Sequence, residues 1–369
     1  MLLQKHRETI SKIQVKSSEV IFLPLLNRVN VKKQLLLVAL LLVGIAGMAQ
    51  PPAGYYDAIA GKVDKDVKTA LFGIINQHTV RTYKELWTDL QTTDRRADGK
   101  VWDMYSNVTN FTFVDKQCGN YSKEGDCYNR EHSLPNSWFG GDKQSPMYTD
   151  LFHMYPTDGF VNNMRGNNPF GEVGNVTKQS KGGYSKLGSC SFPGYSGIVF
   201  EPDDEYKGDF ARTYFYMVTC YEDRVATWDS EMLSKDRYPA FSTWAIHLLL
   251  KWHRQDPVSQ KEIDRNNVVY GIQNNRNPFI DYPVLAEFVW GDYMLEPVDM
   301  KGLTLYSNDY DVTSVAPATS QAPVVEAIYD ISGRKVNVMT RGVYIITYRY
   351  ADGSVRNVKK TIAHYGSED

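Results

Sequence analysis

Two short segments in the middle of the chain carry residues whose types and spacing suit hydrolytic chemistry. Residues 129–132 read Asn-Arg-Glu-His, and a second segment, residues 150–162, ends on Asn162. Hydrolysis of a phosphate diester needs a deprotonated water and a positive charge against the phosphate. A neutral histidine can take the proton, and one carboxylate with one amide oxygen can hold a hard cation such as Mg²⁺, which keeps several waters. Glu131, Asn162 and His132 supply that set.

The local structure must bring these side chains to one face. Residues 156–159 form a turn with capping residues, so a short helix should begin directly after it. Asn162 and Arg165 are three apart and would share a face of that helix. Adjacent residues of a regular strand point to opposite faces, so Glu131 and His132 must lie at a strand end or an irregular turn. An Arg-Glu-His run alone is more often a solvated surface than a site.

The elements around these segments are mainly helical. Apolar residues recur at helical spacing across residues 57–77, residues 202–218 and residues 244–252. Residues 101–155 are instead rich in aromatic, β-branched, Asn and Gly residues, which indicates short strands and long loops. Loops held by a rigid scaffold are where catalytic residues concentrate. Tyr206, Phe210, Tyr214 and Trp252 are expected in the core.

The beginning of the chain differs in composition from the rest. A basic pair, Lys32-Lys33, precedes an apolar run at residues 35–48, which indicates a signal peptide cleaved after Ala49. The run is shorter than the roughly 20 residues that a membrane helix needs, so export is favoured over a membrane anchor. The mixed segment before Val31 does not fit a signal peptide. Translation in a bacterium could start near Val31, because GUG can encode valine or initiate.

The charge balance changes when the leader is removed. Residues 50–369 hold 34 basic and 41 acidic residues, a net charge near −7. Proteins that bind nucleic acid without specificity usually carry a basic face. Any basic groove must therefore be local, and the function has to be argued from the candidate site.

Four cysteines stand at positions 118, 127, 190 and 220. An even number in an exported chain indicates disulfides, with three possible connectivities. We favour Cys118–Cys127 and Cys190–Cys220. A zinc site is the weaker alternative, because neither pair has the short spacing of a zinc knuckle.

The end of the chain predicts a separate module. Residues 311–323 are rich in Ser, Thr, Ala and Pro, which is typical of a linker. Four β-rich stretches follow, separated by turns at residues 330–333 and at Asp352-Gly353. They hold no catalytic cluster. The predicted strands are residues 324–329, 336–338, 342–350 and 354–362.

The residues above resemble the endonuclease I family, whose members are secreted or periplasmic DNA and RNA nucleases built on a ββα-metal motif. The resemblance covers roughly residues 58–290 and keeps many matches in one order. It is carried by residues 129–135 with Trp138, residues 150–162 with Arg165 and Asn167, Phe200-Glu201-Pro202 with Gly208-Asp209, Asp256-Pro257-Val258-Ser259, Arg265-Asn266-Asn267, Gly271, Gln273 and residues 276–280.

This resemblance implies a role for each candidate residue. His132 would be the general base, and Glu131 and Asn162 would bind the metal directly. The implied metal is Mg²⁺, with Mn²⁺ or Ca²⁺ as substitutes. Arg130 and Arg165 are both candidates for phosphate contact, and the sequence does not choose between them.

The chain departs from the family in one detail and carries an addition. Many relatives have two histidines after the Asp-Leu pair, whereas this chain has Phe152 and then His153. The tail from Val324 resembles the C-terminal sorting domains of proteins exported by the type IX route in Bacteroidetes. Tyr329-Asp330, residues 332–336 and residues 342–346 carry that likeness, and the extra residues 363–369 depart from it. A docking or partner-binding β-module is the alternative.

We therefore expect an α+β fold, a mainly helical scaffold that carries a ββα-metal nuclease motif, with a small C-terminal all-β module. The expected parts are a leader (1–49), a nuclease domain (50–310), a linker (311–323) and a sorting-type domain (324–369).

The expected function is an exported, metal-dependent endonuclease. It would cut DNA, and RNA as a further substrate, with low sequence specificity and 5′-phosphate ends. The protein would be a monomer that is secreted, on the cell surface or in the periplasm, and the export machinery would be its partner. The alternatives are a non-catalytic secreted nucleic-acid-binding or adhesion protein, and a phosphodiesterase for small phosphate esters. Intact Glu131, His132 and Asn162 favour an enzyme.

Overall fold

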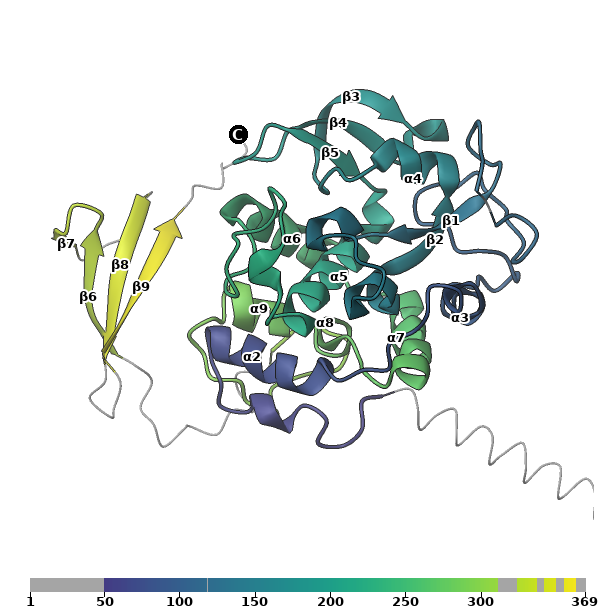
Figure 1. Ribbon diagram of the computed structural model, residues 1–369. Coiled ribbons are helices and arrows are strands. Elements are labelled where there is room, and N and C mark those ends of the chain that lie inside the picture. The colour runs from purple at the N-terminus through teal and green to yellow at the C-terminus, as the bar shows by residue number, and fades with distance from the viewer. Residues whose placement is uncertain (1–49, 118, 311–323, 337–341, 350–354, 363–369) are drawn as a thin grey trace, which may run out of the picture. The chain divides into compact units, whose positions relative to one another are not determined.

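The computed structural model describes residues 50–117, 119–310, 324–336, 342–349 and 355–362 (Figure 1). The predicted leader and the predicted linker lie outside these residues. Within the described part of the chain, no helix is long and apolar enough to cross a membrane.

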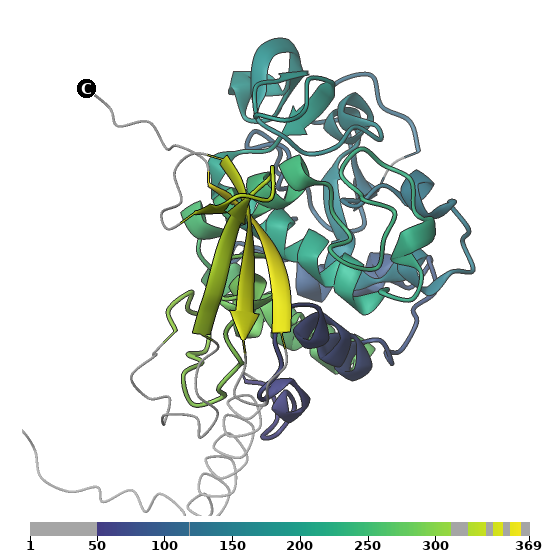
Figure 2. The same cartoon turned by 90° about the vertical axis from the view of Figure 1, so that its left-hand side faces the viewer.

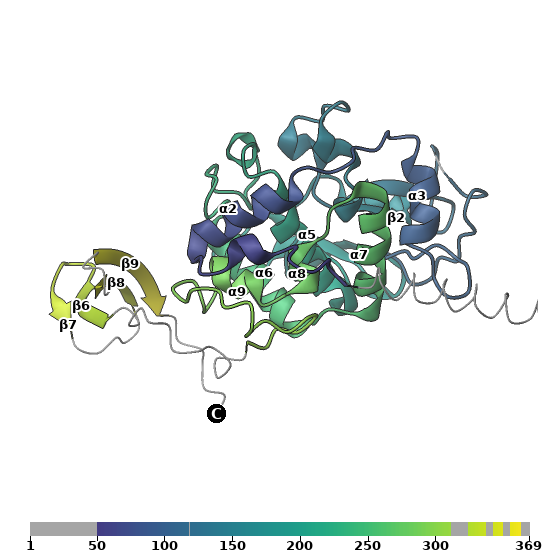
Figure 3. The ribbon, with the colours of Figure 1, turned by 90° about the horizontal axis from the view of Figure 1, so that it is seen from below.

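A buried helix, α5 (Lys207–Cys220), forms the centre of the scaffold, and every residue of it after Lys207 is buried. Helix α6 (Thr243–Gln255) packs along it, and α2 (Asp64–Ile75) lies against it (Figures 1 and 3). The core cluster includes Tyr206, Phe210, Tyr214 and Trp252, as predicted. The remaining helices of this scaffold are α3 (Leu86–Thr93), α7 (Gln260–Gln273), α8 (Pro278–Asp281) and α9 (Leu285–Trp290).

Short 3-10 turns lie between these helices and strands. They are Asp57–Ile59, Asn136–Phe139, Pro146–Thr149, Leu151–His153, Lys181–Gly183, Asp204–Tyr206 and Val225–Thr227.

A two-stranded sheet and one short helix hold the candidate residues. Strand β1 (Tyr128–His132) pairs antiparallel with β2 (Met154–Asp158), so that His132 lies opposite Met154. Helix α4 (Gly159–Arg165) follows β2 directly, and the Asp158 carboxylate accepts a hydrogen bond from the Val161 amide at 2.9 Å. This cap is the one that the turn at residues 156–159 predicted.

A second, three-stranded antiparallel sheet was not predicted. It consists of β3 (Val173–Gln179), β4 (Lys186–Cys190) and β5 (Ile198–Glu201), in that order. Strand β3 is exposed along most of its length and its pairing with β4 shifts register twice. A strand without a buried face lacks the apolar alternation by which sequence reveals strands.

The helix predictions are confirmed with one correction. Helices α5 and α6 occupy the regions predicted, but the single helix expected across residues 57–77 is wrong at its beginning. A 3-10 turn covers only Asp57–Ile59, Gly61 follows with a φ of +69°, and α2 starts only at Asp64. A positive φ is a conformation that glycine adopts readily and that interrupts a helix.

The C-terminal strands are confirmed. They are β6 (Val324–Asp330), β7 (Lys335–Val336), β8 (Gly342–Arg349) and β9 (Val355–Ile362). They form an antiparallel sheet in the order β7-β6-β8-β9, and its long strands lie side by side in Figure 2.

One of the two predicted disulfides is wrong. Cys190 and Cys220 are both free thiols, and each donates to a nearby carbonyl, of Phe192 and Ile75 respectively. Cys190 is the last residue of β4, and Cys220 is the last residue of the buried helix α5. Cys118 lies outside the described residues, and its pairing with Cys127 stays a prediction.

Candidate active site

A cavity of about 420 Å³ lies where β1 meets α4. Four of the five predicted site residues line it: Arg130, Glu131, His132 and Asn162. Arg165 is absent from its wall. The rest of the wall consists of Tyr83, Tyr121, Asn129, Pro135, Asn136, Tyr148, Asn163, Gly166 and Asn167.

The end of strand β1 brings two neighbouring residues to this cavity. His132 is the last residue of β1, and Glu131 precedes it opposite Tyr155. Both side chains line the cavity although they are adjacent. The sequence left open a strand end or an irregular turn, and the structure shows the strand end: the alternation of a regular strand stops at His132.

The His132 ring is held by its surroundings. Nε2 lies 2.9 Å from the Tyr148 carbonyl oxygen, and Nδ1 lies 3.3 Å from the Asn136 side-chain nitrogen. A carbonyl can only accept, so we assign the proton to Nε2 and the lone pair to Nδ1. The ring also packs on Tyr83 and Tyr148. Burial, and then the neighbouring His153, lower the pKa of His132 to about 3. The imidazole is neutral at pH 7 and can accept a proton.

A buried network stands behind Glu131. Its Oε1 accepts hydrogen bonds from the Arg165 guanidinium and from the Tyr105 hydroxyl, the latter at 3.0 Å. Burial raises the pKa of Glu131, and the charge of Arg165 opposes that shift. The charge of Arg165 thus offsets part of the cost of burying a carboxylate that is 5 % exposed.

Arg165 has no contact with solvent. It is 0 % exposed, and it also donates to the Ser133 carbonyl at 2.6 Å and to the His132 carbonyl at 3.2 Å. Its guanidinium lies over the Phe170 ring at 4.2 Å. Of the two arginines expected to contact phosphate, Arg165 does not fit that role, because a substrate cannot reach it. Its position supports Glu131 and the end of β1.

Arg130 occupies a different environment. It is half-buried, lines the cavity, and has its guanidinium carbon 3.5 Å from the Tyr83 ring centroid and 4.2 Å from that of Trp87. It donates to the Tyr83 carbonyl, and its Nε has no hydrogen-bond partner in the described part of the chain. Burial lowers the pKa of Arg130. A cation held between aromatic rings at the wall of a cavity is placed to meet an anion.

The oxygen donors of the cavity suit a hard cation. Asn162 on α4 is half-buried, and its side-chain amide makes no hydrogen bond to any other described residue. It shares the cavity with the Glu131 carboxylate. One carboxylate and one uncommitted amide oxygen are the donor set that Mg²⁺ accepts while it keeps several waters.

Comparison with known proteins identifies the family of this chain. The family model for Endonuclease I matches residues 64–284. The chain belongs to the endonuclease I family. The "Extracellular ribonuclease" of Bacillus subtilis (strain 168) is 35% identical over 260 residues, which cover 68% of this chain and 83% of that protein.

Two further relatives extend the comparison. The "Extracellular ribonuclease" of Bacillus amyloliquefaciens is 35% identical over 243 residues, 64% of this chain and 78% of that protein. The "Endonuclease-1" of Buchnera aphidicola subsp. Baizongia pistaciae (strain Bp) is 30% identical over 133 residues, 36% of this chain and 46% of that protein. The resemblance noted in the sequence is confirmed, and membership of this family places the chain among the nucleases.

Sequence reasoning missed several residues of this endonuclease I site. Tyr105 contacts Glu131 from 26 positions earlier, and the Tyr83 carbonyl accepts from Arg130 47 positions later. Tyr148 orients His132 through its backbone. None of these contacts has a local sequence signal, because each depends on tertiary packing.

His153 belongs to the support of the site. It is fully buried and its Nε2 donates to the Met147 carbonyl at 2.6 Å. Asp150, at the start of the same segment, accepts from the hydroxyls of Tyr216 and Tyr221 and from Gln273. These contacts hold the loop that precedes β2.

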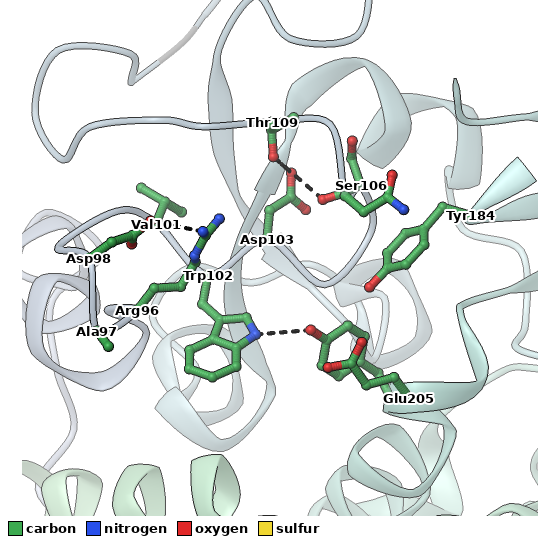
Figure 4. Close-up of a pocket in the computed structure, with 12 residues that line it drawn as sticks. Arg96, Ala97, Asp98, Val101, Trp102, Asp103, Ser106, Thr109, Tyr184 and Glu205 are labelled. Atoms are coloured by element: carbon green, nitrogen blue, oxygen red, sulfur yellow. Dashed lines mark hydrogen bonds and ion pairs between the residues drawn. The ribbon is translucent and has the colours of Figure 1, made fainter. Parts of the chain in front are cut away.

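A larger cavity of about 490 Å³ contains none of the predicted site residues (Figure 4). On its wall Trp102 donates to the Tyr206 hydroxyl at 2.9 Å, and Asp103 accepts from Thr109 at 2.8 Å. Asp103 also accepts from the backbone amide of Tyr105, and burial raises the pKa of Asp103 to about 7. This region supports the loop from which Tyr105 reaches Glu131.

Proposed function

We propose that this protein is an exported, metal-dependent endonuclease that hydrolyses phosphodiester bonds of RNA and DNA with little sequence preference. The observation that carries the proposal is the cavity in which a neutral His132, with Nδ1 free of a proton, meets Glu131 and Asn162. The family and the names of the relatives, extracellular ribonuclease and endonuclease, support it.

Strands β1 and β2 with helix α4 would form the ββα-metal unit. Glu131 from β1 and Asn162 from α4 would hold a divalent cation, with Mg²⁺ the expected ion and Mn²⁺ or Ca²⁺ as substitutes. When bound, the ion supplies positive charge against the negative charge that develops on the phosphate. Arg165 fixes the Glu131 carboxylate in the orientation that this binding needs.

The chain's own residues then carry out proton transfer and binding. His132 Nδ1 takes a proton from the attacking water, while Nε2–H stays on the Tyr148 carbonyl and keeps the ring in place. Arg130, which lines the same cavity, contacts the phosphate. The new bond joins the water oxygen to phosphorus, and the bond to the 3′ oxygen breaks. That oxygen takes a proton from solvent water, and His132 returns its proton to solvent. The products carry a 5′-phosphate and a 3′-hydroxyl.

The proposed location is outside the cytoplasm. The predicted signal peptide, which lies between Val31 and Ala49, and the extracellular relatives support export. We propose that the tail from Val324 is a type IX sorting domain and that the enzyme acts as a monomer.

The test uses protein that begins at Gln50, with plasmid DNA and a single-stranded RNA as substrates. Cleavage in Mg²⁺ that stops with chelator, together with 5′-phosphate ends, is the expected result. Binding without cleavage would instead favour the adhesion alternative. Hydrolysis of bis(p-nitrophenyl) phosphate without cleavage of either polymer would favour a small-ester phosphodiesterase.

A further inference from the structure

A second hollow of about 420 Å³ lies beside the catalytic cavity. Asn163 lines both, so the two hollows meet on helix α4. The wall of the second one consists of Phe160, Asn163, Met164, Lys178 and Gln179. It therefore joins α4, which carries the proposed metal ligand Asn162, to strand β3.

The residues of helix α4 lie in three different surroundings. Val161 and Arg165, four apart, are buried, and Asn162 lines the catalytic cavity. Phe160 and Met164 are also four apart and line the second hollow together. The same short helix thus holds an apolar face toward the second hollow and a ligand toward the catalytic cavity.

Phe160 is unusual in its exposure. It is 39 % exposed, and no other phenylalanine, tyrosine or tryptophan in the described part of the chain is as exposed. Packing of the core does not need this ring, because Val161 and Arg165 make the buried contacts of α4. An exposed aromatic ring next to a candidate site indicates a surface that contacts a ligand.

A lysine of strand β3 lines the same hollow as this ring. Lys178 is exposed on β3 and has no ion-pair partner among the residues that the structure describes. The register of β3 against β4 shifts between Val176 and Lys178. Such an irregularity redirects a side chain relative to a regular strand, and it is frequent beside active sites.

We propose that this second hollow is a subsite for one unpaired nucleotide, one position beyond the two nucleotides that flank the scissile phosphate. The base stacks on Phe160 with Met164 beside it, and Lys178 pairs with the phosphate of that nucleotide. This inference rests on the proposed nuclease function. An aromatic ring with a neighbouring cation is the combination by which proteins hold single strands without reading sequence.

The subsite favours single strands over duplexes. In a duplex the bases are stacked on one another and paired, so the Phe160 ring can meet a base only after that base has left the stack. Stacking on Phe160 therefore adds to the binding of a single strand and not to that of an intact duplex. A strand that reaches past the scissile bond gains this contact, and a dinucleotide does not.

The experiment compares Phe160→Ala with wild type on three substrates in Mg²⁺: a single strand of about ten nucleotides, the matched duplex, and a dinucleotide. For Phe160→Ala we expect KM for the single strand to rise about tenfold, so that its advantage over the duplex and the dinucleotide is lost. Phe160→Trp should restore it, since an indole also stacks. Val176→Ala is the matched control. It removes an exposed apolar side chain of β3 that lies outside the hollow, and it should leave KM for all three substrates unchanged.

Lys178 gives an independent measurement. For Lys178→Ala the slope of log(kcat/KM) against log salt should become shallower by about 0.7 on the single strand. Lys62→Ala, an exposed lysine outside both hollows, should leave the slope as it is.

Two results would overturn the subsite. One is an equal loss for Phe160→Ala on all three substrates, and the other is no loss on any. The proposed function fails separately, if wild type cleaves none of them. In that case fluorescence anisotropy of the labelled single strand still shows whether Phe160 and Lys178 contribute to binding.

Discussion

The two sides of Glu131 differ in a way that separates catalysis from support. On the closed side, Arg165 is 0 % exposed, and its guanidinium pairs with Glu131 and donates to backbone carbonyls. On the open side, Arg130 lies at the wall of the cavity against Tyr83 and Trp87. We propose that the two arginines have different functions, because Arg165 is buried and Arg130 lines the cavity. Variants on the open side should affect turnover, and variants on the closed side should affect stability as well.

The largest expected effect is that of His132→Ala, on the open side. Loss of the general base should lower kcat by roughly 10²–10⁴-fold or more. The protein should keep its fold and most of its affinity for nucleic acid, because His132 lies in the wall of the cavity. Plasmid cleavage and circular dichroism measure the two quantities. Turnover near that of wild type would remove His132 from its assigned role.

Arg165→Met and Arg130→Met test the comparison directly. Removing Arg165 leaves the buried Glu131 carboxylate without its cation, so unfolding should become easier by about 3–5 kcal/mol and activity should be lost. Removing Arg130 should change the free energy of unfolding by about 1 kcal/mol at most and raise KM. Urea unfolding with steady-state kinetics checks both. Equal destabilisation by the two variants would show that the two sides do not differ as described.

Variants of the two proposed metal ligands should differ in their stability and in their rescue by metal. Only Glu131 both lines the cavity and pairs with the buried Arg165. Asn162→Ala should weaken cleavage and recover part of it at high Mg²⁺ or Mn²⁺, since a neutral amide contributes less attraction than a carboxylate. Glu131→Ala should recover less and should also unfold more easily, because it leaves Arg165 unpaired. A titration of activity against metal concentration measures this. Full rescue of Glu131→Ala by metal would argue against its role as a ligand.

How far the sequence predicts this site depends on how local each determinant is. The cap at Asp158 follows from neighbouring residues and was predicted, and for His132 the sequence narrowed the position to a strand end or an irregular turn. The different environments of Arg130 and Arg165 depend on burial, which the residue type does not encode. Strand β3 was missed because it lacks an apolar face. The contact of Tyr105 with Glu131 joins residues 26 positions apart, and only the folded chain brings them together.

Buried histidines of the scaffold predict how stability depends on pH. Burial lowers the pKa of His253 to about 3 in the folded chain, whereas a histidine in the unfolded chain has a pKa of about 6.5. Below about pH 6.5 the unfolded chain binds a proton that the folded chain does not, so the free energy of unfolding falls as the pH falls. Between pH 7 and pH 5 this residue alone should remove about 2 kcal/mol.

His253→Gln should reduce that pH dependence by about the same amount. His247→Gln, an exposed position of the same helix α6, is the matched control and should leave it unchanged. Urea unfolding at pH 7 and pH 5 gives the comparison. An unaltered pH dependence in His253→Gln would mean that other groups cause the acid destabilisation.

The smallest effect is expected from removing the C-terminal module. The residues that line the catalytic cavity, as far as the structure describes them, all lie between Tyr83 and Asn167, so a chain that ends at Tyr310 should cleave at the wild-type rate. The cut must spare Tyr310 itself. Its ring packs on Phe288 at 4.9 Å, and its hydroxyl accepts from the Asp299 amide at 3.1 Å. A chain that ends at Gly302 loses these contacts and should unfold more easily by about 2–4 kcal/mol. If the chain that ends at Tyr310 were inactive or insoluble, residues 311–369 would be part of the catalytic fold, and the proposed domain boundary would be wrong.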